Sequence, residues 1–258
     1  MKQRILTGII IACLFAVPFY LGGSWFSSLM FVIAFIAYTE WLKMGGISPI
    51  HFIGVISLSA LTALFITTLF LEQSNYIVPI IAVITLVYLV TLVFNSLIKM
   101  EQFGFGLMGL VYIGVGCLSL AQLRNEEGLI WTLSILLMII STDTGAYFIG
   151  KKWGKQKLAP KVSPNKTIEG MIGGTSVAIL LSVFLQSAFQ PFETYFYTIL
   201  IALFVSLAGQ LGDLVESAIK RYYGVKDSGK ILPGHGGVLD RVDSWIFVFV
   251  VLSVLQLF

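Results

Sequence analysis

The C-terminal part of the chain contains two apolar segments, 195–214 (YFYTILIALFVSLAGQLGDL) and 242–258 (VDSWIFVFVVLSVLQLF). Between them lies a polar loop, 215–241 (VESAIKRYYGVKDSGKILPGHGGVLDR). Between Asp213 and Asp243 the chain carries five carboxylates and five cationic side chains. Ionisable groups beside or inside a bilayer are costly and usually functional. The pattern predicts two membrane-spanning helices joined by a functional polar loop.

The composition extends this interpretation to the whole chain. Of its 258 residues, 57% are hydrophobic and only 11% are charged, and the mean hydropathy is +0.94. A soluble domain is about a quarter charged and about half apolar. Apolar runs of about 20 residues, the length that crosses a bilayer as a helix, recur along the chain. We therefore predict an all-α polytopic membrane protein rather than a soluble helical protein with a very large core.

Nine apolar segments are expected to cross the membrane. They are 5–20, 24–42, 53–71, 76–95, 103–122, 129–149, 171–189, 195–214 and 242–258. The first resembles a signal peptide. However, no clear small-residue cleavage site follows it and another apolar run begins at once, so we expect a first transmembrane helix.

The distribution of basic residues predicts the orientation. If the N-terminus is cytoplasmic, the loops on that side carry 15 of the 16 lysines and arginines, and only Arg124 lies on the other side. The positive-inside rule therefore places the N-terminus in the cytoplasm and the C-terminus outside. We therefore expect the polar loops to face the cytoplasm, and the short polar N-terminus and the absence of a tail suit a bacterial plasma (inner) membrane protein.

Two polar loops, 150–170 and 215–241, fall on this cytoplasmic side. Residues 1–125 contain few polar groups, so we expect them to be a scaffold of transmembrane helices. We expect residues 126–258 to be the catalytic half. No internal repeat is present, which disfavours an inverted-repeat transporter.

The carboxylates of the C-terminal loop follow helical spacing. Asp213, Glu216 and Lys220 recur at i, i+3 and i+7 and would share one helix face. Asp240 and Asp243 are again three residues apart, at the start of the last apolar segment. Helix capping and ion pairing would explain one such residue, whereas five together indicate a site. Carboxylate oxygens of this kind suit Mg²⁺ bound together with substrate phosphates.

A glycine-rich turn, 233–237 (PGHGG), lies in the same loop. Gly236 and Gly237 would let main-chain N–H groups approach an anion closely. A single histidine is more often structural than catalytic, but His235 lies within the charged loop, and we predict a direct role for it.

The other polar loop begins beside a charged residue in an apolar segment. Asp143 would be costly there without a metal or a cationic partner. Six lysines follow between residues 151 and 166, and attraction to anionic lipid head groups would also explain them. Thr167 could cap the next helix, and because helix N-termini bind phosphate, we predict Lys166 and Thr167 as phosphate contacts.

At these residues the chain resembles the phosphatidate cytidylyltransferase (CDP-diacylglycerol synthase) family. The matching positions are Ser217, Lys220, Arg221, Lys226, Asp227, Gly229, Leu232, Pro233, His235, Gly236, Gly237, Asp240, Arg241 and Asp243. The stretches DTGAYFIGKKWGK (143–155) and SPNKTIEG (163–170) are also similar to the family. The resemblance covers about the last 120 residues, whereas the N-terminal half matches only as a run of helices.

The resemblance implies an integral membrane nucleotidyltransferase of phospholipid biosynthesis. Such an enzyme transfers CMP from CTP to phosphatidic acid and releases CDP-diacylglycerol and pyrophosphate. The resemblance also implies Mg²⁺ as a cofactor, a monovalent cation such as K⁺ as a further one, a homodimer, and no nucleic-acid partner.

This reaction suggests a role for each predicted site residue. We expect metal binding by Asp213, Asp240 and Asp243, with Glu216 and Asp143 as further or indirect ligands. We expect phosphate binding by Lys220, Arg221, Lys226 and Arg241. His235, Gly236 and Gly237 would support the triphosphate or orient a carboxylate.

Three other classes of membrane protein fit the sequence less well. A transporter or channel would explain the charges of Asp143 and Asp213 but not the phosphate-suited loops on one side. A CDP-alcohol phosphatidyltransferase would carry a D-x-x-D-G-x-x-A-R type motif, which the chain lacks. A purely structural membrane scaffold would have little reason to concentrate charge in this way.

Overall fold

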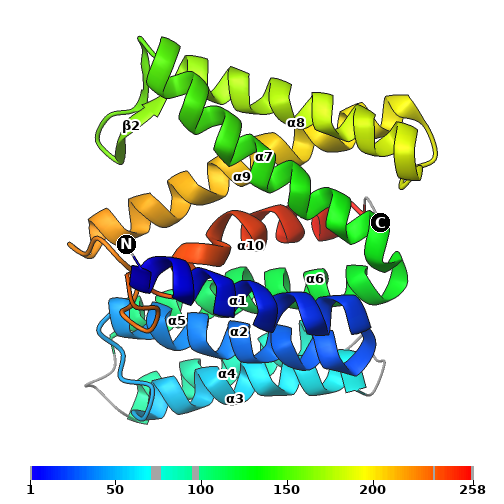
Figure 1. The fold of residues 1–258 in the computed structure, drawn as a ribbon. Helices are drawn as coiled ribbons and strands as arrows, with labels where there is room; N and C mark the ends of the chain where they lie inside the picture. Colours follow the sequence, from blue (N-terminus) through cyan, green and yellow to red (C-terminus); the bar gives the residue numbers. More distant parts are fainter. Residues whose placement is uncertain (1, 71–76, 95–98, 235, 257–258) are drawn as a thin grey trace. The chain divides into compact units, whose positions relative to one another are not determined.

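The computed structural model describes residues 2–70, 77–94, 99–234 and 236–256. These residues are almost entirely helical (Figure 1). The helices are α1 (Lys2–Leu21), α2 (Gly23–Met44), α3 (Phe52–Phe65), α4 (Ile77–Phe94), α5 (Met100–Gly109), α6 (Gly116–Glu126), α7 (Gly128–Trp153), α8 (Ile168–Phe189), α9 (Tyr195–Tyr222) and α10 (Leu239–Val254). Two π-helical turns, η1 (Ile66–Phe70) and η3 (Leu110–Val115), extend α3 and join α5 to α6.

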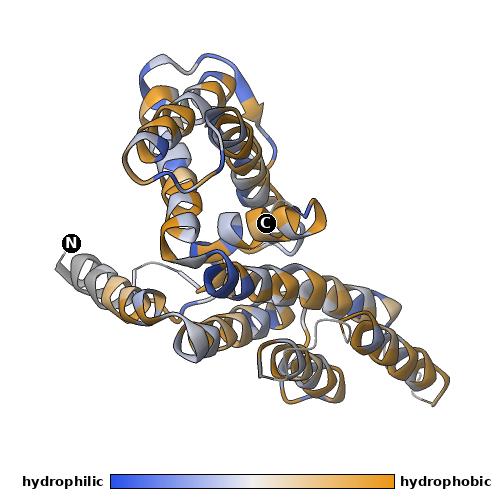
Figure 2. Cartoon of the chain, turned by 90° about the vertical axis from the view of Figure 1, so that its right-hand side faces the viewer, coloured by the Kyte–Doolittle hydropathy of each residue, from blue (hydrophilic) through white to orange (hydrophobic). Residues whose placement is uncertain are grey.

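The predicted all-α, polytopic membrane class is confirmed. Each predicted apolar segment overlaps a helix, although α10 ends at Val254 and the last predicted segment continues into a turn. Among the described residues, seven continuous helices are long and apolar enough to cross a bilayer. Figure 2 shows apolar residues along most of the helices and polar residues gathered in loops and near helix ends. The count of nine spans and the orientation of the termini stay predictions.

Contacts between residues divide the chain into two compact units. The N-terminal unit contains residues 1–125 and also 227–241, and the C-terminal unit contains 126–226 and 242–258. The loop segment 227–241 therefore packs with the N-terminal helices, which were predicted as scaffold. The assignment of scaffold and catalytic roles to the two halves stays a prediction.

In the N-terminal unit, α3 contacts α2, α4 and α5, and α5 also contacts α2 and α4 (Figure 1). The ring of Trp41 stacks on Phe105 with centroids 4.5 Å apart, and its Nε1–H donates to the Phe105 carbonyl at 2.9 Å. The Tyr38 hydroxyl donates to the Gly106 carbonyl at 2.7 Å. Lipid offers no hydrogen bonds to main-chain groups. The side chains of Trp41 and Tyr38 therefore stabilise α5 close to the point where the chain changes from α-helical to π-helical turns.

The first hairpin is closed by the side chain of Arg124. Gly22 and Gly23 both adopt positive φ, of 67° and 53°, which lets α1 end and α2 begin within two residues. Arg124 donates to the carbonyl oxygens of Phe19 at 2.8 Å and Tyr20 at 3.0 Å. This arginine, the one basic residue predicted on the outer face, therefore satisfies the exposed carbonyl end of α1.

The C-terminal unit is built on close contact between α7 and α8. Gly170 and Gly174 face the main chain of α7, and a Cβ atom at Gly174 would lie 2.5 Å from the Thr142 carbonyl oxygen. Small residues at such positions let two membrane helices approach closely. Helix α9 packs against both α7 and α8.

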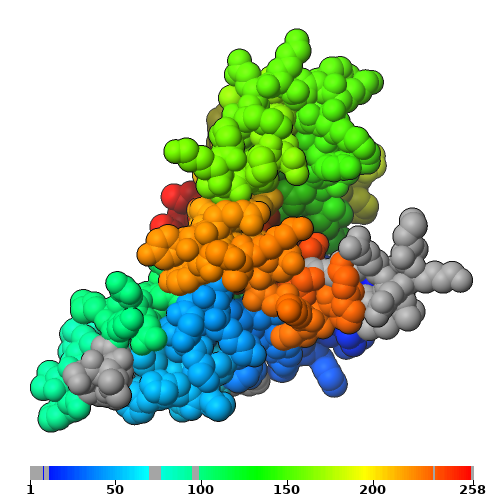
Figure 3. Space-filling model, turned by 90° about the vertical axis from the view of Figure 1, so that its left-hand side faces the viewer, coloured from blue at the N-terminus to red at the C-terminus, as the bar shows by residue number. Residues whose placement is uncertain are grey.

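The loop predicted between residues 150 and 170 contains a small antiparallel hairpin of β1 (Lys157–Ala159) and β2 (Ser163–Thr167). Lys157 pairs with Thr167 and Ala159 with Ser163. Glu169, in the first turn of α8, accepts main-chain N–H groups of Lys155 and Gln156, which anchors the hairpin. The face in Figure 3 shows long side chains that project from this part of the chain.

Substitution of Gly174 by alanine should destabilise the protein. The added methyl group would overlap the Thr142 carbonyl, and overpacking of this kind costs about 1–3 kcal/mol. Gly209→Ala is the matched control, because its Cβ would meet only Val248 and Ile139, at 3.6 and 3.7 Å. Melting in detergent should show a lower midpoint for Gly174→Ala alone. Equal midpoints for the two variants would contradict the close α7–α8 contact.

Candidate active site

The predicted polar stripe lies on α9, which continues to Tyr222 beyond the apolar segment. Glu216 is 1% exposed and forms an ion pair with Lys220, one turn later. The Ser217 hydroxyl donates to Asp213 Oδ1 at 3.3 Å. Helical spacing thus brings together the residues that the sequence grouped, and the buried carboxylate is paired with a cation as burial requires.

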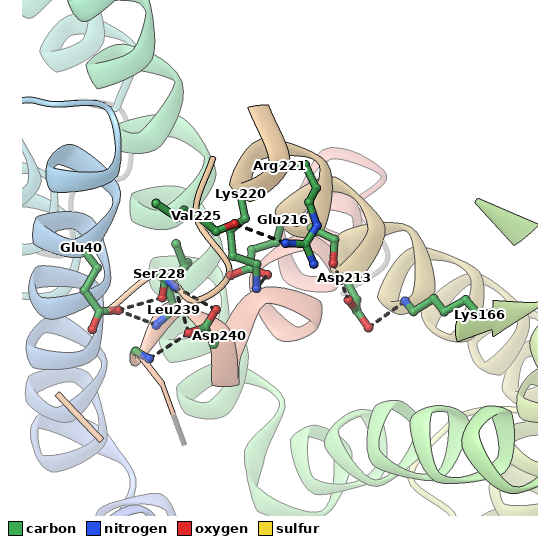
Figure 4. A network of polar contacts seen from close by, with 12 residues as sticks. Glu40, Lys166, Asp213, Glu216, Lys220, Arg221, Val225, Ser228, Leu239 and Asp240 are labelled. Carbon is green, nitrogen blue, oxygen red and sulfur yellow. Dashed lines mark hydrogen bonds and ion pairs between the residues drawn. The ribbon is translucent and has the colours of Figure 1, made fainter. Parts of the chain in front are cut away.

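The hairpin contributes a second cation to this stripe. Lys166 Nζ, on β2, lies 2.7 Å from Asp213 Oδ2, and both side chains are partly exposed (Figure 4). The next residue, Thr167, caps α8, because its hydroxyl accepts the Gly170 N–H at 3.1 Å. The predicted capping role of Thr167 is therefore confirmed, and phosphate binding by Lys166 and Thr167 stays a prediction.

Two more carboxylates lie near Asp213 within the C-terminal unit. Asp143 is on α7 and Asp243 is on α10, and the three are close enough for their charges to interact. No group of three acidic, histidine or cysteine side chains among the described residues is arranged to hold a metal ion. The three aspartates supply the hard oxygen ligands that Mg²⁺ prefers, so the donor set fits this ion in chemistry.

The segment 227–241, which we call the signature segment, is organised around Asp240. The Ser228 N–H donates to both carboxylate oxygens of Asp240, at 3.1 and 3.0 Å, and the Gly237 N–H donates to Oδ2 at 2.8 Å. Gly236 adopts a φ of +84°, which favours glycine. The Gly237 N–H does approach an anion, which is the protein's own Asp240 carboxylate, and an approach of Gly236 and Gly237 to a bound phosphate stays a prediction.

A second carboxylate of the N-terminal unit, Glu40 on α2, also holds the signature segment (Figure 4). Glu40 accepts the Val238 N–H at 3.1 Å, the Leu239 N–H at 2.9 Å and the Ser228 hydroxyl at 3.3 Å. The sequence interpretation missed this residue. A charged residue within the apolar segment 24–42 was the available signal, and it was applied to Asp143 but not to Glu40.

The other predicted phosphate-binding cations are exposed. Arg221, in the last turn of α9, is exposed and donates to the Val225 carbonyl at 3.4 Å. Lys226 and Arg241 are also exposed, as phosphate-binding cations at a surface would be. The prediction for His235 lies outside the described residues.

The Lys166–Asp213 ion pair should contribute little to stability. Partly exposed ion pairs are worth at most about 1 kcal/mol. We therefore expect Lys166→Met to leave the melting midpoint in detergent close to that of the unmodified protein. A fall as large as that of Gly174→Ala would show that the pair is structural.

Comparisons with known proteins agree with these features. The model of the cytidylyltransferase family matches residues 2–258. A phosphatidate cytidylyltransferase of Bacillus subtilis (strain 168) is 41% identical over 261 residues, 96% of this chain and 94% of the relative. Those of Staphylococcus epidermidis and Staphylococcus aureus (strain COL) are 39% and 40% identical and cover 99% of this chain and 98% of each relative. The chain belongs to the cytidylyltransferase family.

Proposed function

We propose that this chain is a phosphatidate cytidylyltransferase, which transfers CMP from CTP to phosphatidic acid in phospholipid biosynthesis. The products are CDP-diacylglycerol and pyrophosphate. The observation that carries the proposal is the cluster in the C-terminal unit, where Lys166 and Lys220 pair with Asp213 and Glu216 on one helix. Such a cluster of acids and cations suits a site that brings two phosphate-bearing substrates together.

The chemistry needs charge neutralisation more than it needs a base. A phosphate monoester has a second pKa of about 6, so phosphatidate is largely dianionic at neutral pH. One of its phosphate oxygens forms a bond to the α-phosphorus of CTP, and the bond to pyrophosphate breaks. The cations Lys166, Lys220, Arg221, Lys226 and Arg241 would bind the phosphates of the two substrates and reduce their mutual repulsion.

Magnesium is the proposed cofactor. Asp213 and Asp243 would hold it, with Asp143 and Glu216 as further or indirect ligands, and Asp240 stays a predicted ligand. When bound, Mg²⁺ neutralises charge that develops on transferring phosphoryl groups. A monovalent cation such as K⁺ is proposed as a second cofactor.

We further propose that the protein is a homodimer in the bacterial inner membrane. The basic loops would face the cytoplasm, where CTP is available, with the N-terminus inside and the C-terminus outside. Phosphatidic acid would enter from the bilayer. The concentration of lysines and arginines in loops on one predicted side supports this orientation.

The reaction is tested by pyrophosphate release from the detergent-purified protein. We expect release only when phosphatidic acid, CTP and Mg²⁺ are present together, with CDP-diacylglycerol in the lipid extract. ATP in place of CTP, omission of lipid and removal of the metal with EDTA are the controls. No release from folded protein would contradict the proposal, and ion transport should then be tested.

Replacement of Asp243 by asparagine tests the metal site. The substitution keeps the size of the side chain and removes its charge, so turnover should fall by at least roughly 10- to 100-fold and the Mg²⁺ requirement should rise. Glu101→Gln, at an exposed position on α5, is the matched control and should keep full turnover. Unchanged turnover and Mg²⁺ dependence in folded Asp243→Asn protein would exclude Asp243 as a ligand.

A further inference from the structure

Glu40 is a charged residue in the part of the chain that was expected to be only a scaffold. Its side chain is near the end of α2 and the residue is 2% exposed. A buried carboxylate is costly unless it is hydrogen-bonded or paired with a cation. No ion pair between described residues involves Glu40. Its carboxylate is therefore stabilised by hydrogen bonds, and those from described residues come from the signature segment.

Two of these hydrogen bonds come from the start of α10. The Val238 and Leu239 N–H groups precede and begin this helix, where main-chain donors lack partners within the helix. A carboxylate at a helix N-terminus is favoured by the helix dipole, and hydrogen bonds to a charged acceptor are stronger than neutral ones. Glu40 thus acts as a cap for α10 that is supplied from a distant part of the sequence.

The third hydrogen bond links Glu40 to the Asp240 network. Ser228 donates its hydroxyl to Glu40 and its main-chain N–H to Asp240. Gly237 donates its N–H to Asp240. The two carboxylates therefore fix both ends of the signature segment through one shared residue.

Glycines of the signature segment make room for the Glu40 carboxylate. A Cβ atom at Gly229 would overlap the side chain of Glu40, which supplies all three of its nearest neighbouring atoms. A Cβ atom at Gly237 would overlap Ser228 Oγ and Glu40 Oε2. Neither glycine has a positive φ, so their backbone conformation is open to alanine. At Gly229 the absence of a side chain is explained by the Glu40 side chain, whereas at Gly237 it is explained by Ser228 Oγ, Glu40 Oε2 and the Gly229 main-chain nitrogen together.

From these contacts we propose that Glu40 is a positioning residue for the transfer reaction. Its carboxylate holds the signature segment in one conformation, and through it the predicted phosphate ligand Arg241 and the predicted metal ligand Asp240. The inference rests on the proposed function for its effect on catalysis, but its structural part can be tested without turnover. Glu40 itself would contact no substrate.

Hydrogen exchange tests the structural part. In Glu40→Ala protein, the amides of residues 228–239 should exchange faster, while α2, α3 and α5 of the same unit should keep their protection. Glu101→Gln should change neither region. Unchanged exchange in the segment would overturn the proposal. So would faster exchange throughout the N-terminal unit, because Glu40 would then support the fold as a whole.

A double-mutant cycle tests whether Gly229 and Glu40 act through one contact. Gly229→Ala alone should lower the melting midpoint and reduce kcat/KM for CTP at least 10-fold. In the Glu40→Ala background the overlap is gone, so adding Gly229→Ala should leave the melting midpoint nearly unchanged and change kcat/KM less than twofold. Contacting residues show such non-additivity, whereas independent sites add. Equal losses in both backgrounds would contradict the proposed contact.

Activity then tests the functional part. Glu40→Ala should reduce kcat/KM for CTP at least 10-fold, and Glu40→Gln should reduce it less, because the amide keeps one acceptor oxygen. Turnover within twofold of the unmodified protein for both variants would overturn the positioning role. An inactive unmodified protein would instead contradict the proposed function, and the exchange experiment would still decide whether Glu40 holds the segment.

Discussion

The structure depends on the rule that a charged group in a membrane helix must find its partner inside the protein. Three carboxylates in helices of membrane-spanning length find such partners in two different ways. Glu216 and Asp213 pair with lysines, whereas Glu40 accepts hydrogen bonds from the main chain and a serine. The first solution leaves cations near acids, as a phosphate-binding site needs. The second holds the segment 227–241 through its main chain.

Much of the fold could be predicted from the sequence, because bilayer thickness sets the length of apolar runs and helical spacing groups the residues of α9. The contacts of Glu40 could not, since its partners lie 188 to 199 positions away and a single sequence carries no trace of such pairing. The hairpin of β1 and β2 was missed because its lysine-rich residues lack the apolar alternation of a strand. The packing of 227–241 with the N-terminal unit was missed for the same reason as Glu40.

For the glycine-rich turn, the predicted type of contact is present, but the anion that is contacted differs from the one predicted. Gly236 and Gly237 were predicted to bring N–H groups to a bound anion, and the Gly237 N–H does reach one. That anion is Asp240, and Gly237 is also close to Glu40. Carboxylates of the protein can therefore shape a glycine-rich loop in the way that a phosphate would. A triphosphate-binding role for this turn stays a prediction.

In this interpretation Glu40 organises the signature segment, and carboxylates of the C-terminal unit are proposed to bind the metal. The most direct measurement is an experimental structure of the protein with Mn²⁺ and a non-hydrolysable CTP analogue, with the metal located by its anomalous scattering. We expect a metal peak bonded to Asp213 or Asp243, with Glu40 still bonded to Val238 and Leu239. A metal bonded to Glu40, or a signature segment detached from it, would show that Glu40 does not have this positioning role.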